Sequence, residues 1–359
     1  MYGFIADIHL FANNTTPEDH INSLEMFLDI IKKDGEDCDG IFVCGDLFDC
    51  RGNKDELKFA ASYILRMLWN GCKKDGHNAP VYFVHGTFSH DYEQYEIFLP
   101  ILSQLDNVEV HYIKHVTEGK THAGHDVLFL PQEYGDVDYT KYLNHGKHYN
   151  LIVGHGPISS VNKAPCKSKS CEITHSVDLL GDISDLCVFG HFHDYTDFGN
   201  NVYYIGANLR WKYGEDEPCV FFTCDSNFKV KTQLNPFAKE YKTIHISSPE
   251  ELREHISQEE KENHRRFIIN AETAQELETY HAIINNNKNE KLLSFRITSN
   301  IDEEENDITK IDLNEIKRNN TGLDPVHSLI SYIKDKYNVD ASSQIKEYEQ
   351  KINKDIEDE

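Results

Sequence analysis

Short apolar runs rich in β-branched and aromatic residues alternate with amphipathic stretches over residues 1–245. This alternation predicts an α/β fold. The expected strands are 2–6, 40–44, 81–85, 108–112, 127–130, 151–153, 186–189, 202–205, 219–224 and 229–234. Residues 17–33 and 54–74 have the apolar spacing of helices, with one side directed at a core.

The pattern changes after residue 245. A charged helix over 250–264, a strand over 266–270, a helix over 273–284 and a strand over 292–298 predict a small β-α-β domain at 246–300. Residues 301–324 are acidic and polar, which predicts a solvated linker. Residues 325–359 place apolar side chains on one helical face, which either docks back on the chain or binds another protein, and we expect a helical tail that binds a partner.

Charge and cysteine usage narrow the class of protein. Asp and Glu number 61 against 36 Lys and Arg, a formal net charge of −25, so a broad basic face for nucleic acid is not expected. The nine cysteines include no C-x-x-C pair, which favours reduced thiols in the cytoplasm over a zinc ribbon or disulfide framework. We expect neither a secretory signal nor a membrane-spanning helix.

Five short motifs each follow an expected strand. They are Asp7-Ile8-His9, Gly45-Asp46, Ser89-His90-Asp91, Gly154-His155 and Gly190-His191-Phe192-His193. Each alone is typical of an ordinary turn or a packed histidine. Residues two apart in an extended segment project to the same side, so both D-x-H and H-x-H can reach one point. Five such motifs together predict a site for Mn, Fe or Zn, whose ligands are carboxylates and imidazoles.

The order of these motifs resembles that of the calcineurin-like metallophosphoesterases. Within that superfamily the chain resembles the nuclease subunit of SbcCD-type DNA double-strand-break repair complexes, especially the phage-encoded versions. The sequences that carry this finer resemblance are Gly45-Asp46-Leu47-Phe48-Asp49, Tyr204-Ile205-Gly206-Ala207 and Tyr213-Gly214-Glu215. The segment 246–300 stands where that family carries its DNA-capping domain.

The resemblance implies a fold and a ligand set. The fold would be two facing mixed sheets flanked by helices, with the β-α-β segment as a capping domain. Two divalent ions, most readily Mn²⁺, would lie at the strand ends. Asp7, His9 and His193 would hold the first ion, His155 and His191 the second, and Asp46 would bridge them. His90 would be the catalytic histidine, oriented by Asp91.

The resemblance also implies an activity and partners. The chain would be a Mn-dependent DNA exonuclease and endonuclease in repair or recombination, a homodimer working with an SMC-like ATPase. A stand-alone phosphatase or phosphodiesterase, and a non-catalytic scaffold of the same complex, are the alternatives. Arg210, Trp211 and Lys212 follow the last motif and could contact DNA or form an ordinary packed loop.

One motif departs from the family pattern. The family's third motif is usually G-N-H-D, whereas this chain has Gly86-Thr87-Phe88-Ser89-His90-Asp91. Ser89 stands where the asparagine would, and Thr87 is the alternative ligand under a second alignment. A hydroxyl is a weaker ligand than a carboxamide oxygen, so we expect a looser second metal.

Overall fold

The computed structural model describes most of the chain up to residue 299. The described residues are 1–12, 15–33, 38–50, 52–69, 73–74, 77–91, 94–102, 109–133, 137, 139, 141–143, 146–159, 174–215, 217–257, 263–287 and 293–299. Residues 1–299 form one unit by their contacts. The linker and tail that we predict over 301–324 and 325–359 lie outside the described residues.

The first of two six-stranded sheets contains the N-terminal strand at its centre. Its strand order is β16-β15-β1-β2-β5-β6. The strands β1 (Tyr2–Ile5), β2 (Gly40–Cys44), β5 (Val81–Val84) and β6 (Val110–Ile113) pair in parallel. β15 (Val220–Cys224) pairs antiparallel with β1 on one side and with β16 (Val230–Leu234) on the other. Every residue of β1, β2 and β5 is buried, which explains their near-continuous apolar sequences.

The second sheet has the strand order β13-β14-β12-β9-β8-β7. Its members are β13 (Thr196–Asp197), β14 (Val202–Tyr204), β12 (Ser184–Gly190), β9 (Tyr149–His155), β8 (Asp126–Leu130) and β7 (Thr117–Lys120). The four inner strands run parallel and the two edge strands antiparallel. In both sheets the parallel strands end at the edge that carries the predicted motifs.

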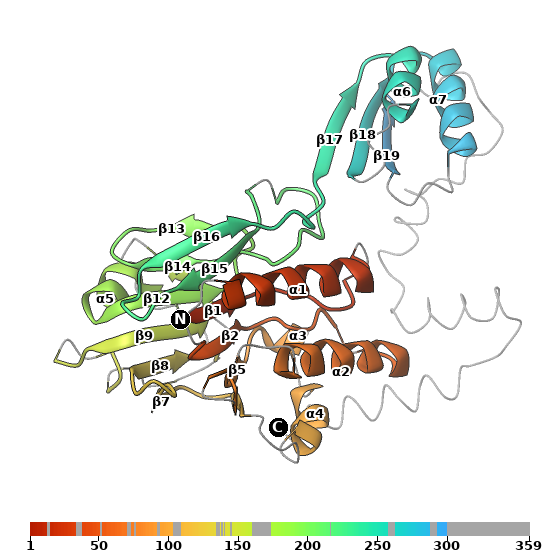
Figure 1. The fold of residues 1–359 in the computed structure, drawn as a ribbon. Coiled ribbons are helices and arrows are strands. Elements are labelled where there is room, and N and C mark those ends of the chain that lie inside the picture. Colours follow the sequence, from red (N-terminus) through yellow and green to blue (C-terminus); the bar gives the residue numbers. More distant parts are fainter. Residues whose placement is uncertain are drawn as a thin grey trace, which may run out of the picture. The chain divides into compact units, whose positions relative to one another are not determined.

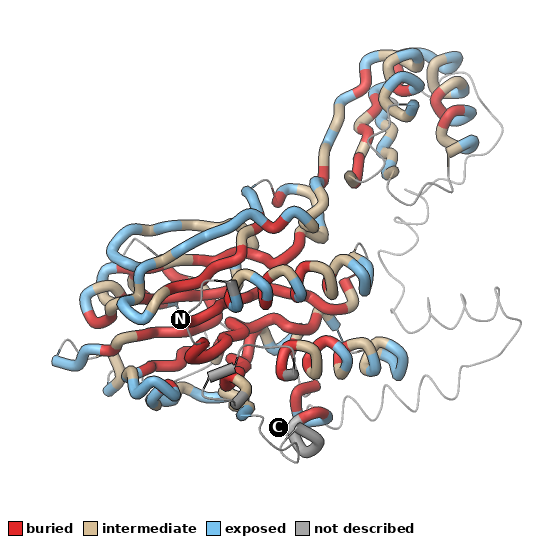
Figure 2. The backbone as a smooth tube through the Cα atoms, viewed as in Figure 1, coloured by how far each residue is buried: buried red, intermediate tan, exposed pale blue. Residues whose placement is uncertain are grey.

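The two sheets face each other across an aromatic core. Phe4, Phe42 and Tyr82 lie on three neighbouring strands of the first sheet, and their ring centroids are 5.2 Å and 4.7 Å apart in succession. Phe129 of β8 contacts Tyr82 from the second sheet at 5.6 Å. Figure 2 shows the buried residues following these central strands. Two facing mixed sheets confirm the predicted fold class.

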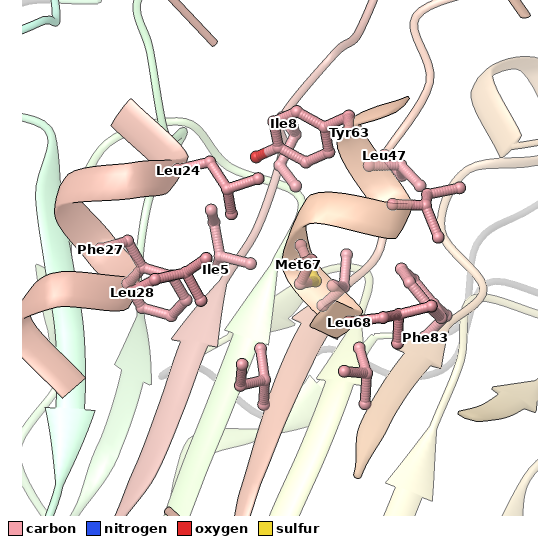
Figure 3. Close-up of a cluster of buried hydrophobic side chains, with 14 of the residues drawn as sticks. Ile5, Ile8, Leu24, Phe27, Leu28, Leu47, Tyr63, Met67, Leu68 and Phe83 are labelled. Atoms are coloured by element: carbon pink, nitrogen blue, oxygen red, sulfur yellow. The ribbon is translucent and has the colours of Figure 1, made fainter. Parts of the chain in front are cut away.

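Helices cover the outer faces of both sheets (Figure 1). On the first sheet, α1 (Pro17–Lys33) and α2 (Lys54–Trp69) share an apolar cluster with β1, as the labelled side chains of Figure 3 show. On the second sheet, Leu180 of α5 (Val177–Asp182) is fully buried against Ile152 and Cys187. The short helices α3 (Phe88–Asp91) and α4 (Gln94–Leu102) follow β5.

Four short strands lie outside the three main sheets. They are β3 (Lys73–Lys74) paired with β4 (His77–Asn78), and β10 (Ile158–Ser159) paired with β11 (His175–Ser176). The expected helix over 54–74 therefore ends early, at Trp69, because its last two residues belong to a strand.

A small α/β unit follows β16 in sequence. Its parallel strands are β17 (Tyr241–Ile246), β18 (His264–Ala271) and β19 (Leu293–Ser299), with α6 (Pro249–Ser257) and α7 (Ala274–Asn286) between them. Leu252, Phe267 and Tyr280 form its core. The strands expected at 266–270 and 292–298 and the helix at 273–284 are present, but β17 was not expected. The predicted boundary at 245/246 falls inside β17, and the domain division stays a prediction.

The aromatic core between the sheets can be tested at Phe42, which is fully buried among four other rings. Phe42→Ala should lower the free energy of unfolding in urea by about 3–5 kcal/mol. The substitution leaves a cavity between the two sheets, and the sheets cannot move together to fill it. Leu234→Ala is the control, since Leu234 is 63% exposed, and should change it by less than about 0.5 kcal/mol. Equal small effects of both variants would contradict this account of the core.

Candidate metal centre

The ends of four parallel strands bring the motif residues together. Asp7 and His9 follow β1, Asp46 follows β2, His155 ends β9, and His191 and His193 follow β12. Two groups consist of predicted metal ligands, each with its ligand atoms within 4.8 Å of one another: Asp7, His9 and His193 in one, and Asp7, Asp46 and His155 in the other. A third group of the same kind joins His9 to Asp49 and His90. The resemblance implies that Asp46 bridges two ions, whereas the residue common to the first two groups here is Asp7.

His191 takes a different place from the other five predicted ligands. Its backbone N–H donates to both carboxylate oxygens of Asp7, at 3.1 Å and 3.0 Å. Its ring lies 5.3 Å from the ring of His155 and belongs to none of these groups of ligand atoms. Burial and the neighbouring His155 lower the pKa of His191 to about 4, so the ring is neutral at pH 7.

Unusual backbone geometry delivers the first three ligands. Asp7, His9 and Asp46 have φ values of 46°, 47° and 48°, in the left-handed region that L residues seldom adopt. The amides of Asp7 and His9 donate to the carbonyls of Gly45 and Asp46, which keeps the two loops side by side. Such strain is retained at functional sites when the surrounding structure imposes it.

Gly45 makes room for the second group of ligands. It has a φ of 80°, and a Cβ at this position would lie 2.2 Å from Nδ1 of His155. Any other residue would therefore collide with the imidazole and strain the backbone. The glycine in the Gly45-Asp46 motif thus allows His155 to approach the end of β2.

The Nδ1 atoms of three histidines are occupied, which leaves their Nε2 atoms for the cluster. His155 Nδ1 donates to the carbonyl oxygen of Cys44 at 2.8 Å, because a carbonyl can only accept. His9 Nδ1 lies 3.2 Å from a carboxylate oxygen of Asp49, and His193 Nδ1 is hydrogen-bonded to Glu215. Such partners orient metal-bound histidines in general.

The Nε2 atoms provide a test of whether a cation fits. Those of His9 and His193 lie only 3.1 Å apart, and Nε2 of His155 lies 3.2 Å from Oδ2 of Asp46. With the Nδ1 positions protonated, these Nε2 atoms present lone pairs to each other and to a carboxylate. A proton or a metal ion must lie between such atoms, so the donor set fits divalent cations.

Electrostatics within the cluster favour a positive occupant. Burial raises the pKa of Asp7, which is 0% exposed. Burial alone would lower the pKa of His155, but the carboxylates of Asp46 and Asp7 raise it to about 10. Burial raises the pKa of Asp46, yet His155 outweighs it and holds that pKa well below its usual range. Without a metal, the proton on His155 supplies the positive charge.

Thr87, and not Ser89, occupies the position beside the second group. The Thr87 N–H donates to Asp46 Oδ1 at 2.6 Å, and its hydroxyl lies 3.1 Å from Asp46 Oδ2 and 3.4 Å from His155 Nε2. Gln132 accepts from the same hydroxyl at 3.0 Å. Ser89 is exposed on α3. The geometry therefore selects the second alignment of the third motif.

Asp91 does not orient His90, contrary to what the resemblance implies. Its buried carboxylate accepts the backbone N–H groups of Asp46, Phe48 and Gly86. These bonds fix the loop that carries Asp46. The carbonyl oxygen of Asp49 holds His90 instead, at 2.7 Å from its Nδ1.

Sequence reasoning assigned no role to several residues that contact the cluster. Asp49 and Glu215 appear in the segments that resemble the repair nucleases, and each holds the Nδ1 side of a predicted ligand. Gln132 had no motif to single it out. Trp211 packs its ring 4.8 Å from His9 and 5.4 Å from His193.

The loop carrying Trp211 is held by Arg210. The Arg210 guanidinium donates to the backbone carbonyls of Glu215, Glu217 and Ala238. Lys212 lies over the Trp211 ring at 4.7 Å and pairs with Glu215 at 3.7 Å. Both cations therefore serve the local structure around Glu215.

This buried set of carboxylates and imidazoles at the strand ends of two facing sheets defines a metal-dependent hydrolase of phosphoesters. The family model of the calcineurin-like phosphoesterases matches residues 2–195, and the chain belongs to that family. Metallophosphoesterases bind divalent metals, and the clustered residues form a possible dinuclear site. The predicted superfamily is thereby confirmed, whereas the finer resemblance to the SbcCD-type nucleases stays a prediction.

Part of this chain is also similar in sequence to a hydrolase with another named substrate. The UDP-2,3-diacylglucosamine hydrolase of Shewanella loihica is 31% identical over 83 residues, which are 23% of this chain. The match spans 30% of that protein's length. Among the described residues, the structure contains no helix of sufficient length and apolarity to span a membrane.

The carboxylate behind His193 should set metal affinity. Glu215→Gln keeps the side-chain volume but removes the charge that orients His193, so Mn²⁺ should bind about 10–100-fold more weakly to metal-stripped protein. Titration calorimetry measures this. Glu217→Gln, on an exposed neighbour, is the matched control and should leave the affinity unchanged. Equal affinities of both variants would show that Glu215 is only structural.

The raised pKa of His155 should make the metal-free fold sensitive to alkali. The pKa of His155 is about 10 in the folded protein and 6.5 in the unfolded chain. Its protonation therefore stabilises the folded state fully below pH 6.5, and this contribution is lost as the pH rises to 10. When a chelator keeps the protein free of metal, the free energy of unfolding should fall by about 1.4 kcal/mol per pH unit between these two pKa values. His155→Gln should fall less steeply. Parallel pH profiles of the two proteins would refute the assignment.

Proposed function

We propose that this phosphoesterase is a Mn-dependent DNA nuclease, acting as exonuclease and endonuclease in DNA repair or recombination. The observation that supports cleavage of a diester most directly is the placement of His90. Its side chain is 28% exposed, and its ring meets that of His9 at 4.8 Å in an edge-to-face contact. An imidazole at the rim of the cluster can reach a bound substrate.

The anchoring of His90 determines which atom can transfer a proton. Its Nδ1 donates to the Asp49 carbonyl, so Nε2 is the atom left for chemistry. A sugar alkoxide is a poor leaving group, and protonation by a positioned acid accelerates its departure. His90 Nε2 would supply that proton. Asp49 thereby positions both His90, through its carbonyl, and His9, through its carboxylate.

The residues of the cluster have separate tasks in this proposal. Asp7, His9 and His193 would hold one ion, His155 and His191 the other, and Asp46 would bridge them. Two bound cations polarise the phosphoryl group and lower the pKa of a water. The Thr87 N–H fixes the Asp46 carboxylate by a hydrogen bond, and Gln132 accepts from the Thr87 hydroxyl beside it. His90 then serves the leaving side of the phosphate.

The partners we propose follow from the resemblance and from charge. A chain with a formal charge of −25 binds a polyanion weakly by itself, so an SMC-like ATPase would supply DNA affinity to a homodimer of this chain. The β17–β19 unit would act as the capping domain. The reduced-thiol composition is typical of the cytoplasm, of a host cell if the chain is phage-encoded.

A second candidate is a stand-alone enzyme that cleaves a nucleotide-linked diphosphate. The identity with the Shewanella loihica hydrolase favours it, because the substrate in that protein's name carries UDP. The non-catalytic scaffold is the remaining alternative. A Mn²⁺-dependent cleavage assay with linear duplex DNA, single-stranded DNA and a UDP-sugar separates the three.

The role of His90 gives the most discriminating prediction. His90→Ala should slow DNA hydrolysis about 10²–10⁴-fold, because the leaving alkoxide loses its proton donor. Hydrolysis of a p-nitrophenyl phosphodiester should fall far less, since nitrophenolate leaves without protonation. Steady-state rates at saturating Mn²⁺ measure both effects.

The controls use neighbouring residues of the same site. Ser89→Ala, one residue away on α3, should retain activity on both substrates, and Asp46→Ala should lose both. A His90→Ala enzyme that cuts DNA at the normal rate would remove the proposed acid. No cleavage of DNA by the wild-type protein, with or without an SMC-like ATPase, would reject the nuclease.

A further inference from the structure

Two exposed phenylalanines lie within the metal motifs. Among the described residues, the large hydrophobic side chains that are exposed are Phe88, Ile97, Phe192 and Leu234. Phe88 is 53% exposed and begins α3, and Phe192 is 52% exposed in the loop after β12. Ile97 and Leu234 lie elsewhere, on α4 and β16.

Both rings are next to residues that form the site. Phe88 directly follows Thr87, whose N–H and hydroxyl contact Asp46, and precedes His90 by two residues. Phe192 separates His191 from His193. The two side chains therefore extend from two different motif segments. Phe88 lies on the segment from β5 to α3, and Phe192 lies on the segment from β12 to β13.

Phe192 is held in one orientation although half of it meets solvent. Its ring makes edge-to-face contacts with His191, at 5.0 Å and 76°, and with Tyr204, at 5.3 Å and 72°. Exposed apolar area forfeits about 25 cal/mol per Å² relative to burial. A small polar residue would fill this loop position without that loss, so an ordered, exposed ring points to a ligand.

Charge near the cluster makes an aromatic contact useful. Arg210 is committed to three backbone carbonyls, and Lys212 pairs with Glu215. The chain as a whole is strongly acidic. Stacking of a base on an aromatic face does not depend on such charge and tolerates every base.

We propose that Phe88 and Phe192 stack on unpaired nucleobases that flank the phosphate held by the cluster. The inference rests on the proposed nuclease function and names its substrate form. Bases within a duplex already stack on one another, so these rings select single strands, flaps or frayed ends. The two phenylalanines are thus specificity-determining residues for the nucleic-acid strand.

A pair of chromogenic diesters isolates the contribution of the base. Thymidine 5′-(p-nitrophenyl phosphate) and methyl p-nitrophenyl phosphate share a leaving group, but only the first carries a base. Phe88→Ala and Phe192→Ala should each raise KM for the thymidine ester about tenfold, in line with the loss of one stacked base. The same variants should leave the kcat and KM of the methyl ester within about twofold.

Matched variants separate stacking from general effects. Leu234→Ala removes an equally exposed apolar side chain from β16 and should change neither ester. Phe192→Tyr retains an aromatic face and should restore a normal KM for the thymidine ester, whereas Phe192→Leu should not. Equal losses on both esters would mean that the rings only support the site, and would overturn the inference.

A binding measurement decides the inference independently of cleavage. A single-stranded oligonucleotide containing 2-aminopurine, mixed with the full-length protein and Ca²⁺, should show quenched fluorescence when its bases stack on the rings. The Phe88→Ala/Phe192→Ala double variant should bind about a hundredfold more weakly, with the quenching lost, if the two stacks contribute equally. Unchanged quenching would overturn the proposal. Quenching by a wild-type protein that cuts no DNA in Mn²⁺ would uphold the stacking and reject the nuclease.

Discussion

Two buried carboxylates, those of Asp7 and Asp46, share one small volume where the two sheets meet. Asp7 is 0% exposed and Asp46 3%, and a buried charge without partners costs several kcal/mol. Their partners come from other strands: the His191 N–H for Asp7, and the Thr87 N–H and His155 for Asp46. The charge is compensated only while β1, β2, β9 and β12 end together. The arrangement of the strands and the arrangement of the site therefore depend on each other.

The convergence of the motifs could be predicted from the sequence, although the strand geometry on which the prediction was based is only partly correct. Residues two apart reach one side of an extended strand, and this placed Asp7 with His9. Both residues in fact adopt a left-handed backbone, outside the strand, and reach the cluster by a tight path along the β2 loop. Spacing and residue type were sufficient because five strand ends limit where the side chains can go. The backbone route is set by hydrogen bonds between loops, which spacing does not record.

Contacts between distant segments are what the sequence could not supply. The choice between Thr87 and Ser89 depends on how the loop after β5 folds over Asp46, and Asp91 directs that fold by binding backbone amides. Glu215 reaches His193 only because Arg210 closes its loop on three carbonyls. The strand β17 was hidden for a different reason. Its buried and exposed positions are mixed, so its polar Lys242 and His245 mask the apolar alternation.

The acidity of the chain and the chemistry of the cluster together order the events at this site. Without cations, the proton on His155 is the positive charge that balances the Asp46 carboxylate, and a chain with a formal net charge of −25 attracts a phosphate weakly. A pair of divalent ions held by the cluster would make the local charge positive, so a phosphate would approach after the metals. Affinity for the rest of the substrate must then come from contacts that ignore net charge. Aromatic faces beside the ligands provide such contacts, and their positions on the motif loops tie substrate selection to the geometry that holds the metals.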